Sequence, residues 1–197
     1  RDIILIGHKG HPEVIGTLGR HPSNSNTKIY LVENNDDIKK LEISSPEVAY
    51  VTQTTLSVDE TRELINSLKE KFPGIIGPSA DDICYATQNR QDAVKQLSLE
   101  CQIVLVIGSQ TSSNSNRLKE LAEKCGTKSF LIDDKTDIDL NSLKDATSVG
   151  ITAGASAPEE IVQEVISFLV PLGFKTVRNL SENNENMTFK LPKELTS

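Results

Sequence analysis

The residue types best suited to chemistry in this chain lie in a polar run, GSQTSSNSNRL, at residues 108–118. The run follows an apolar, strand-like segment at 103–107 and continues into a helical pattern at 118–124. A hydroxyl-rich loop at the start of a helix offers backbone N–H groups, the positive end of the helix dipole and neutral donors, which together bind phosphate or diphosphate. Serine and asparagine are also turn-formers and helix caps, so one such loop does not decide between the two roles.

A second polar segment, HKGHPE at residues 8–13, contains His8, His11 and Glu13. Its order and spacing differ from the HExxH motif, so a zinc site is not predicted. A histidine and a glutamate two residues apart, where a loop meets a helix, suit anion binding and proton transfer. The alternative is a surface loop in which Pro12 begins the helix and the helix dipole favours Glu13. The residues alone leave both interpretations open.

Cys84 lies at the expected start of a helix that ends near Leu97. A helix N-terminus favours the thiolate, which is the form that binds a metal or acts as a nucleophile. Most lone cysteines instead pack as small hydrophobic residues. Cys101 and Cys125 lie just before an expected strand and near an expected helix end, and we predict that both are packing residues. Three scattered cysteines form neither a disulfide framework nor a CxxC metal site.

The elements that position these residues follow from an internal repeat, because a shift of 100 residues aligns TKIYLVE at 27–33 with TKSFLID at 127–133. Each repeat reads strand, polar loop, helix, strand, short helix, strand, polar loop, helix. The strands are continuous apolar runs, which is typical of parallel strands buried on both faces. We therefore predict an α/β fold with two similar small parallel-sheet domains built from βα units. The predicted bounds are 1–80 and 81–178, followed by a tail at 179–197 with a late strand near 187–191.

Two helix starts have the pattern of a capping box. Ser57 precedes Glu60 and the helical run 61–71, and Ser156 precedes Glu159 and the run 161–170, with Pro158 in the first turn. In parallel α/β sheets, ligands bind beyond the carboxyl ends of the strands. The polar loops at 8–13, 53–57, 109–116 and 153–156 all occupy that position, so we predict one shared anion site.

Composition narrows the class of protein. The chain has 197 residues, of which 37% are hydrophobic and 25% charged, as expected of a globular protein with a real core. A net charge of −7 argues against a nucleic-acid or anionic-membrane partner. No apolar run is long enough to span a membrane, and no signal-peptide pattern opens the chain. The cytoplasm is the expected compartment.

Five separated motifs, in the same order, resemble 4-hydroxy-3-methylbut-2-enyl diphosphate reductase, the iron–sulfur enzyme that ends the methylerythritol phosphate route to isoprenoids. The resemblance covers nearly the whole chain. The motifs are GHKGHPEVIGTLG (7–19), YVTQTTLSVDET (50–61), DDICYATQNRQ (81–91), GSQTSSNSNRL (108–118) and GITAGASAPE (150–159).

This resemblance implies three α/β domains around a central 4Fe-4S cluster, which three cysteines hold, one from each domain. It implies a reductive dehydroxylation that converts the substrate to isopentenyl diphosphate and dimethylallyl diphosphate, with electrons from ferredoxin or flavodoxin. By motif, Cys84 matches a cluster ligand, while Glu13 and Thr54 match the proton relay. The implied diphosphate ligands are His11, Ser112, Ser113, Asn114 and Ser156. A plastid stroma would replace the cytoplasm in a plastid-bearing source.

The chain departs from the family pattern, since the first domain and the opening helix of the second have no counterpart. Two cluster cysteines and two active-site histidines are absent with them. The chain begins at Arg1 and is in a strand-like run by Ile3, so we expect a partial sequence that lacks turnover by itself. The alternatives are a non-catalytic diphosphate-binding fragment without a cluster and, more remotely, an enzyme with Cys84 as nucleophile.

Overall fold

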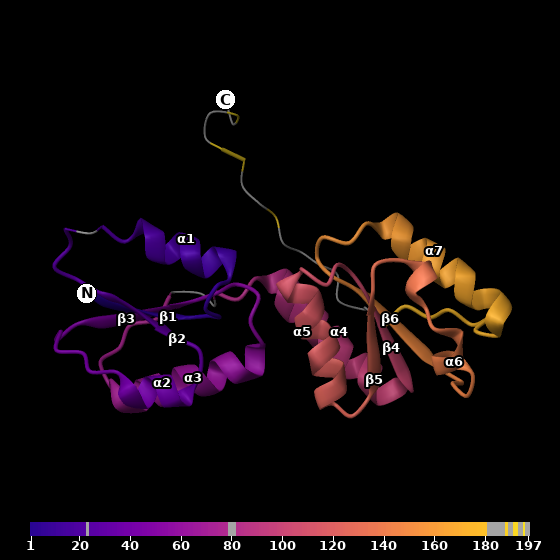
Figure 1. The fold of residues 1–197 in the computed structure, drawn as a ribbon, viewed down its shortest axis with the longest axis horizontal. Coiled ribbons are helices and arrows are strands. Elements are labelled where there is room, and N and C mark those ends of the chain that lie inside the picture. Colours follow the sequence, from indigo (N-terminus) through magenta and orange to yellow (C-terminus); the bar gives the residue numbers. More distant parts are fainter. Residues whose placement is uncertain (23, 79–81, 181–187, 189–190, 193–194, 196–197) are drawn as a thin grey trace.

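The computed structural model describes residues 1–22, 24–78, 82–180, 188, 191–192 and 195. Two three-stranded parallel sheets lie in two lobes side by side, as Figure 1 shows. The first sheet has the order β2-β1-β3 and the second the order β5-β4-β6. The strands are β1 (Asp2–Ile6), β2 (Ile29–Val32), β3 (Val48–Thr52), β4 (Ile103–Ile107), β5 (Lys128–Ile132) and β6 (Val149–Ala153).

Helices cover both faces of each sheet. In the first lobe, α1 lies on one face and α2 and α3 on the other; in the second lobe, α4 and α5 face α6 and α7 across the sheet (Figure 1). We call these lobes the N-terminal unit and the C-terminal unit. The helices are α1 (Pro12–Arg20), α2 (Asn35–Lys40), α3 (Val58–Lys71), α4 (Tyr85–Glu100), α5 (Ser113–Lys124), α6 (Leu140–Leu143) and α7 (Glu159–Leu169), with short 3-10 turns η1 (Lys135–Asp137) and η2 (Val170–Leu172).

The predicted α/β class, parallel sheets and repeat are confirmed. The two sheets have the same strand order, with the first strand of each unit at the centre. The likeness extends to side chains: Asp37 accepts a hydrogen bond from the backbone N–H of Glu33 at 3.0 Å, and Asp137 accepts one from Asp133 at 2.8 Å. The predicted domain boundary at 80/81 falls in 79–81, and most of the predicted late strand at 187–191 also lies outside the described residues.

The core explains why the strands read as unbroken apolar runs. Ile103, Leu105 and Ile107 of β4 pack with Val165 and Leu169 of α7 on one face of the sheet. The other face of the same strand packs against α4 and α5, through Val104, Val106, Val94, Leu97, Leu118 and Leu121. A strand buried on both faces must be apolar at every position, and this holds the C-terminal ends of the strands in a fixed place for the loops that follow.

Of the two predicted capping boxes, the first is half confirmed and the second is wrong. The Ser57 hydroxyl accepts a hydrogen bond from the N–H of Glu60 at 3.4 Å, but the Glu60 carboxylate pairs with Lys124 and Arg117 of α5. The N-cap of α7 is Pro158, which has no side chain to accept a bond. Because Pro158 is extended, with ψ 139°, the helix starts after it and Ser156 lies two residues outside the cap.

Polar contacts join the two units. The Gln91 side chain of α4 is 1% exposed and reaches the loop that follows β3. Its carbonyl oxygen accepts from the N–H of Val58 at 3.0 Å, and its amide donates to the carbonyl of Leu56 at 2.8 Å. Gln91 therefore holds the end of the 53–57 loop and the first turn of α3 against the C-terminal unit.

Replacing Gln91 by leucine is expected to lower the free energy of unfolding by about 2 kcal/mol, because it leaves a buried N–H and a buried carbonyl unpaired. Urea unfolding followed by circular dichroism measures the change. The control is Gln96→Leu on the exposed part of the same helix, which should change stability by less than about 0.5 kcal/mol. Equal losses in the two variants would contradict a connecting role for Gln91.

None of the helices in the described ranges has the length and apolar character that a membrane span requires.

Candidate active site

The loop after β1 ends at His11, which is the N-cap of α1. Its backbone is extended, and its Nδ1 atom accepts a hydrogen bond from the N–H of Glu13 at 3.3 Å. Pro12 occupies the first helical position, where a missing N–H costs nothing. Since Nδ1 is the acceptor, the proton of a neutral His11 ring lies on Nε2, where it can be donated to a ligand.

Glu13 and Thr54, which lie 41 residues apart, are in direct contact. The Glu13 carboxylate accepts from the backbone N–H of Thr54 at 3.1 and 3.2 Å and from its hydroxyl at 3.0 Å. The carbonyl of Thr54 in turn accepts from the N–H of Cys84 at 3.0 Å. The Glu13 carboxyl and the Thr54 hydroxyl are thus in direct contact, and the backbone of Cys84 is bonded to the same segment.

Cys84 is the N-cap of α4, with an exposed side chain that makes no capping hydrogen bond. Its thiol is hydrogen-bonded to no base within the described ranges, so the structure gives no support to a cysteine nucleophile. Cys101 lies at the other end of the same 16-residue helix, about 24 Å from Cys84. Cys125 ends α5 and is exposed, so the prediction that it is a packing residue is wrong. Burial, aided by the charge of Glu100, raises the pKa of the Cys101 thiol, the opposite of what a metal ligand needs.

A 4Fe-4S cluster requires about four ligands, most of them thiolates. The residues that the structure describes contain no group of three or more His, Cys, Asp or Glu side chains arranged to hold a metal ion. Cys84 has the exposure and freedom from hydrogen bonds that a cluster ligand needs, but it is a single thiol. The described residues therefore offer one thiol ligand for such a cluster and do not complete its site.

The hydroxyl-rich run forms the predicted loop at the start of α5. Ser112 is the N-cap, and its hydroxyl accepts from the N–H of Ser115 at 3.3 Å. The Asn116 amide donates to the carbonyls of Gln110 and Ser112 at 2.7 and 2.9 Å and so braces the loop from within. These bonds fix the backbone around the N-terminus of a 12-residue helix, the geometry that favours anions.

Asn114 has a property that the sequence does not reveal. It is 6% exposed, and both its amide nitrogen and its carbonyl oxygen are buried without a hydrogen-bond partner in the described part of the chain. Such a group costs free energy unless something else satisfies it. At the first turn of α5, next to Ser113, a bound anion is the natural partner for the amide nitrogen.

Ser156 belongs to the same sheet edge but contacts none of the other predicted ligands. It is exposed, on the loop between β6 and α7. Its loop is packed tightly onto the α5 loop, because a methyl group at Gly108 or at Gly154 would overlap the Ser115 hydroxyl. Arg90 of α4 also fixes this loop by donating to the carbonyl of Ala153 at 3.0 Å. Ser156 is thus placed beside the α5 loop by the packing of Gly154 on Ser115 and by the Arg90 contact.

Sequence reasoning missed the side chains that join the two halves of the site. Ser113 accepts hydrogen bonds from Thr55 at 3.0 Å and from Gln53 at 3.4 Å. The carbonyl oxygen of Gln53, which is 1% exposed, accepts from the N–H of His8 at 3.0 Å. Nothing in the sequence distinguishes a polar loop residue that joins the two units from one that does not, because the contact forms only when the two units pack.

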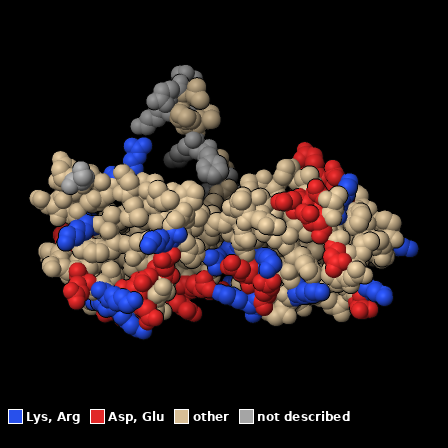
Figure 2. Space-filling model, viewed as in Figure 1, with Lys and Arg blue, Asp and Glu red and all other residues tan. Residues whose placement is uncertain are grey.

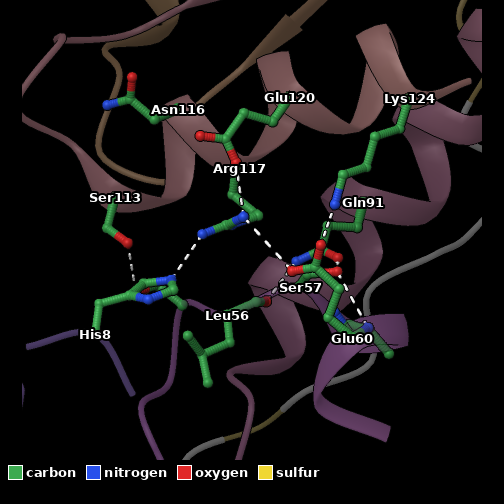
Figure 3. A network of polar contacts seen from close by, with 12 residues as sticks. His8, Leu56, Ser57, Glu60, Gln91, Ser113, Asn116, Arg117, Glu120 and Lys124 are labelled. Carbon is green, nitrogen blue, oxygen red and sulfur yellow. Dashed lines mark hydrogen bonds and ion pairs between the residues drawn. The ribbon is translucent and has the colours of Figure 1, made fainter. Parts of the chain in front are cut away.

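Arg117, one turn after Ser113 on α5, also contacts the N-terminal unit (Figure 3). Its guanidinium lies between His8, Glu60 and Glu120, and Lys124 further along the helix pairs with Glu60. Figure 2 shows charges of both signs interleaved where α3 and α5 meet. The only signal in the sequence is the spacing, since residues four and seven apart share one face of a helix.

Two parallel sheets built from βα units, with hydroxyl and carboxyl groups gathered at the loops after their strands, define an α/β protein with a polar site at the carboxyl ends of its strands. The chain matches the LytB protein family model over residues 1–170 and therefore belongs to that family. The resemblance noted from the motifs is confirmed at this level.

The relatives that the chain matches agree with this family assignment. The chain is 55% identical over 195 residues to a 4-hydroxy-3-methylbut-2-enyl diphosphate reductase of Saccharophagus degradans, covering 98% of this chain and 63% of the relative. It is 53% identical to the Alcanivorax borkumensis reductase of the same name, covering 63% of that protein. Among solved structures, the Plasmodium falciparum E-1-hydroxy-2-methyl-but-2-enyl-4-diphosphate reductase matches with a TM-score of 0.88 and 36% identity, covering 98% of this chain and 60% of that one. This chain thus spans somewhat less than two thirds of the relatives that it matches.

Proposed function

We propose that this chain supplies the diphosphate-binding and proton-transfer side of a 4-hydroxy-3-methylbut-2-enyl diphosphate reductase. The observation that carries the proposal is the connection of two polar clusters across the units. The Glu13–Thr54 pair belongs to the N-terminal unit and the Ser113 loop to the C-terminal unit, and they are joined through residues 53–55. A substrate with a diphosphate at one end and a hydroxyl at the other needs both clusters close together.

The proposed diphosphate site relies on neutral donors and helix dipoles. The N-terminus of α5 offers backbone N–H groups, and the Asn114 amide has an unused donor. The other ligands that we propose are His11, Ser112, Ser113 and Ser156, from loops that follow β1, β4 and β6. Apart from Lys9, these strand-end loops contain no lysine or arginine, so the anion would be recognised by geometry more than by charge.

Glu13 is the proposed proton donor to the leaving hydroxyl. Replacing a C–OH by a C–H consumes two electrons and two protons and releases water, so a group must deliver a proton to the departing oxygen. Thr54 holds the Glu13 carboxyl through its N–H and its hydroxyl, which fixes the direction in which the acid points. A 4Fe-4S cluster, when bound, would supply the electrons for this reaction.

We propose Cys84 as one thiolate ligand of that cluster, with the other thiolates from outside this chain and with ferredoxin or flavodoxin as electron donor. This role is supported by the exposed side chain of Cys84, which makes no capping hydrogen bond, and by the bond from its backbone N–H to the carbonyl of Thr54. The proposed compartment remains the cytoplasm, or the stroma in a plastid-bearing source.

The diphosphate site is tested by replacing Asn114 with leucine, a side chain of similar size. Pyrophosphate affinity of the 197-residue chain, measured by calorimetry, should fall by roughly tenfold as a donor is lost. The free energy of unfolding should stay the same or rise by about 1 kcal/mol, because two buried unpaired atoms are removed. The matched control is Asn66→Leu on the exposed part of α3. Undiminished affinity together with lost stability would show that Asn114 is structural.

The second candidate is a diphosphate-binding fragment without a cluster. It is favoured by the single candidate thiolate among the described residues. Iron and acid-labile sulfide after anaerobic reconstitution of this chain separate the two. Stoichiometric cluster would exclude the fragment without a cluster, whereas pyrophosphate binding with no iron would support it.

A further inference from the structure

We propose that Arg117 is a positioning residue, which holds His8 as the neutral tautomer with its proton on Nδ1 and so fastens the β1–α1 loop to α5. The inference deepens and rests on the proposed function, because the same loop ends at His11 and leads into the first turn of α1, which contains Glu13. It begins from one contact: the Arg117 Nη2 atom lies 2.8 Å from the His8 Nε2 atom (Figure 3).

The chemistry of the guanidinium decides the direction of this bond. Arginine has five N–H donors and no acceptor, and it does not lose its charge in proteins. The Nε2 atom of His8 must therefore be the acceptor, and it carries no proton. The ring nitrogens of histidine divide these roles between them, so the proton of the neutral ring lies on Nδ1.

The guanidinium is itself held from two elements. Its Nη1 atom lies 2.6 Å from the carboxylate of Glu120, on the same helix, and 3.7 Å from that of Glu60, on α3. The Arg117 side chain is 16% exposed, and its Nε atom is buried without a partner among the described residues. Burying a guanidinium with one nitrogen unpaired costs free energy, and a surface ion pair alone contributes little stability in return. The arrangement therefore points to a specific contact such as that with His8.

The loop is thereby tied to α5 at two points on one face of the helix. The His8 backbone N–H reaches Gln53, whose amide reaches Ser113, while the His8 ring reaches Arg117. Ser113 and Arg117 are four residues apart and share that face. Removing Arg117 leaves the loop tied to α5 by the Gln53 contact alone, so the distance between His11 and Ser113 is less tightly fixed.

The test is nitrogen NMR of the imidazoles in the 197-residue chain, which contains three histidines, at pH 8 where an ordinary imidazole is neutral. His8 should be the Nδ1–H tautomer. His11 should be the Nε2–H tautomer in the same spectrum, because its Nδ1 accepts from Glu13, and it serves as an internal contrast. An Nε2–H His8 in the unaltered chain would overturn the proposal whatever the affinity for a ligand.

Arg117→Met should release His8 from the Nδ1–H form and reduce hydrogen-exchange protection of the His8 amide by roughly tenfold. Arg117→Lys, which retains a cation with N–H donors, should restore part of both. The control is Lys119→Met, because Lys119 pairs with Glu123 of the same helix and with no other carboxylate in the described part of the chain. If Arg117→Met leaves both the tautomer and the amide protection as they are in the unaltered chain, the proposal is wrong.

Pyrophosphate affinity tests whether the Arg117–His8 contact contributes to the proposed function. It should weaken by roughly tenfold in Arg117→Met and be unchanged in Lys119→Met. A chain that binds no pyrophosphate would contradict the proposed function, while the tautomer and the amide protection would still decide on Arg117.

Discussion

Glu13→Gln is expected to reduce turnover by about 10²–10⁴-fold, the usual contribution of a general acid. The amide keeps an acceptor oxygen for the N–H of Thr54, so the loop and the diphosphate site should be retained. The amide cannot deliver a proton, so the loss should appear in kcat and not in KM. Turnover is measured in a reductase completed with the part of the Saccharophagus degradans relative that this chain does not match.

The matched control is Glu33→Gln. This substitution removes the same charge from the same edge of the first sheet, where the Glu33 carboxylate accepts a hydrogen bond from the N–H of Lys9 at 2.7 Å. It should retain wild-type kcat. Full activity in Glu13→Gln, or an equal loss in both variants, would remove Glu13 from the proton-transfer role.

Cys84→Ser should abolish the cluster and all turnover in the completed reductase, because a cubane that loses a thiolate ligand is no longer held. Iron, acid-labile sulfide and the visible absorbance of the purified protein measure the loss. The fold should not suffer. The thiol makes no capping bond, and serine is a better N-cap than cysteine, so the free energy of unfolding should stay constant or rise by up to about 1 kcal/mol.

Cys125→Ser provides the comparison, since Cys125 is exposed at the far end of α5 from the site. It should retain iron, sulfide and turnover. A Cys84→Ser protein with a full cluster would refute the ligand role of this residue, and loss of iron in both variants would point to general instability of the protein.

Much of the fold could be read from local patterns. The apolar runs at 103–107 and 3–6 predicted strands buried on both faces, and the structure has β4 and β1 there. The 100-residue repeat predicted two alike sheets, and both have the same strand order. These predictions succeeded because burial on both faces forces an apolar residue at every position, which leaves a signal in the sequence itself.

The two capping-box patterns show a limit of prediction from short stretches of sequence. The pattern at Ser57 and Glu60 predicted reciprocal bonds, yet the Glu60 carboxylate is taken by cations from α5. The pattern at Ser156 predicted a cap that Pro158 occupies instead. A side chain with several partners within reach is assigned by packing of distant segments, which a four-residue pattern does not contain.

By itself, the sequence determined the fold class, the strand-end loops and, through the family resemblance, the identity of the residues proposed to act. Which of these residues contact one another was decided by the tertiary structure alone. It joined Glu13 to Thr54, buried Asn114 without a hydrogen-bond partner among the described residues, and placed Arg117 on His8, which is 109 residues away along the chain. The physical reason is that burial constrains the type of each residue separately and can therefore be read from the sequence. A hydrogen bond between two units exists only once those units have packed.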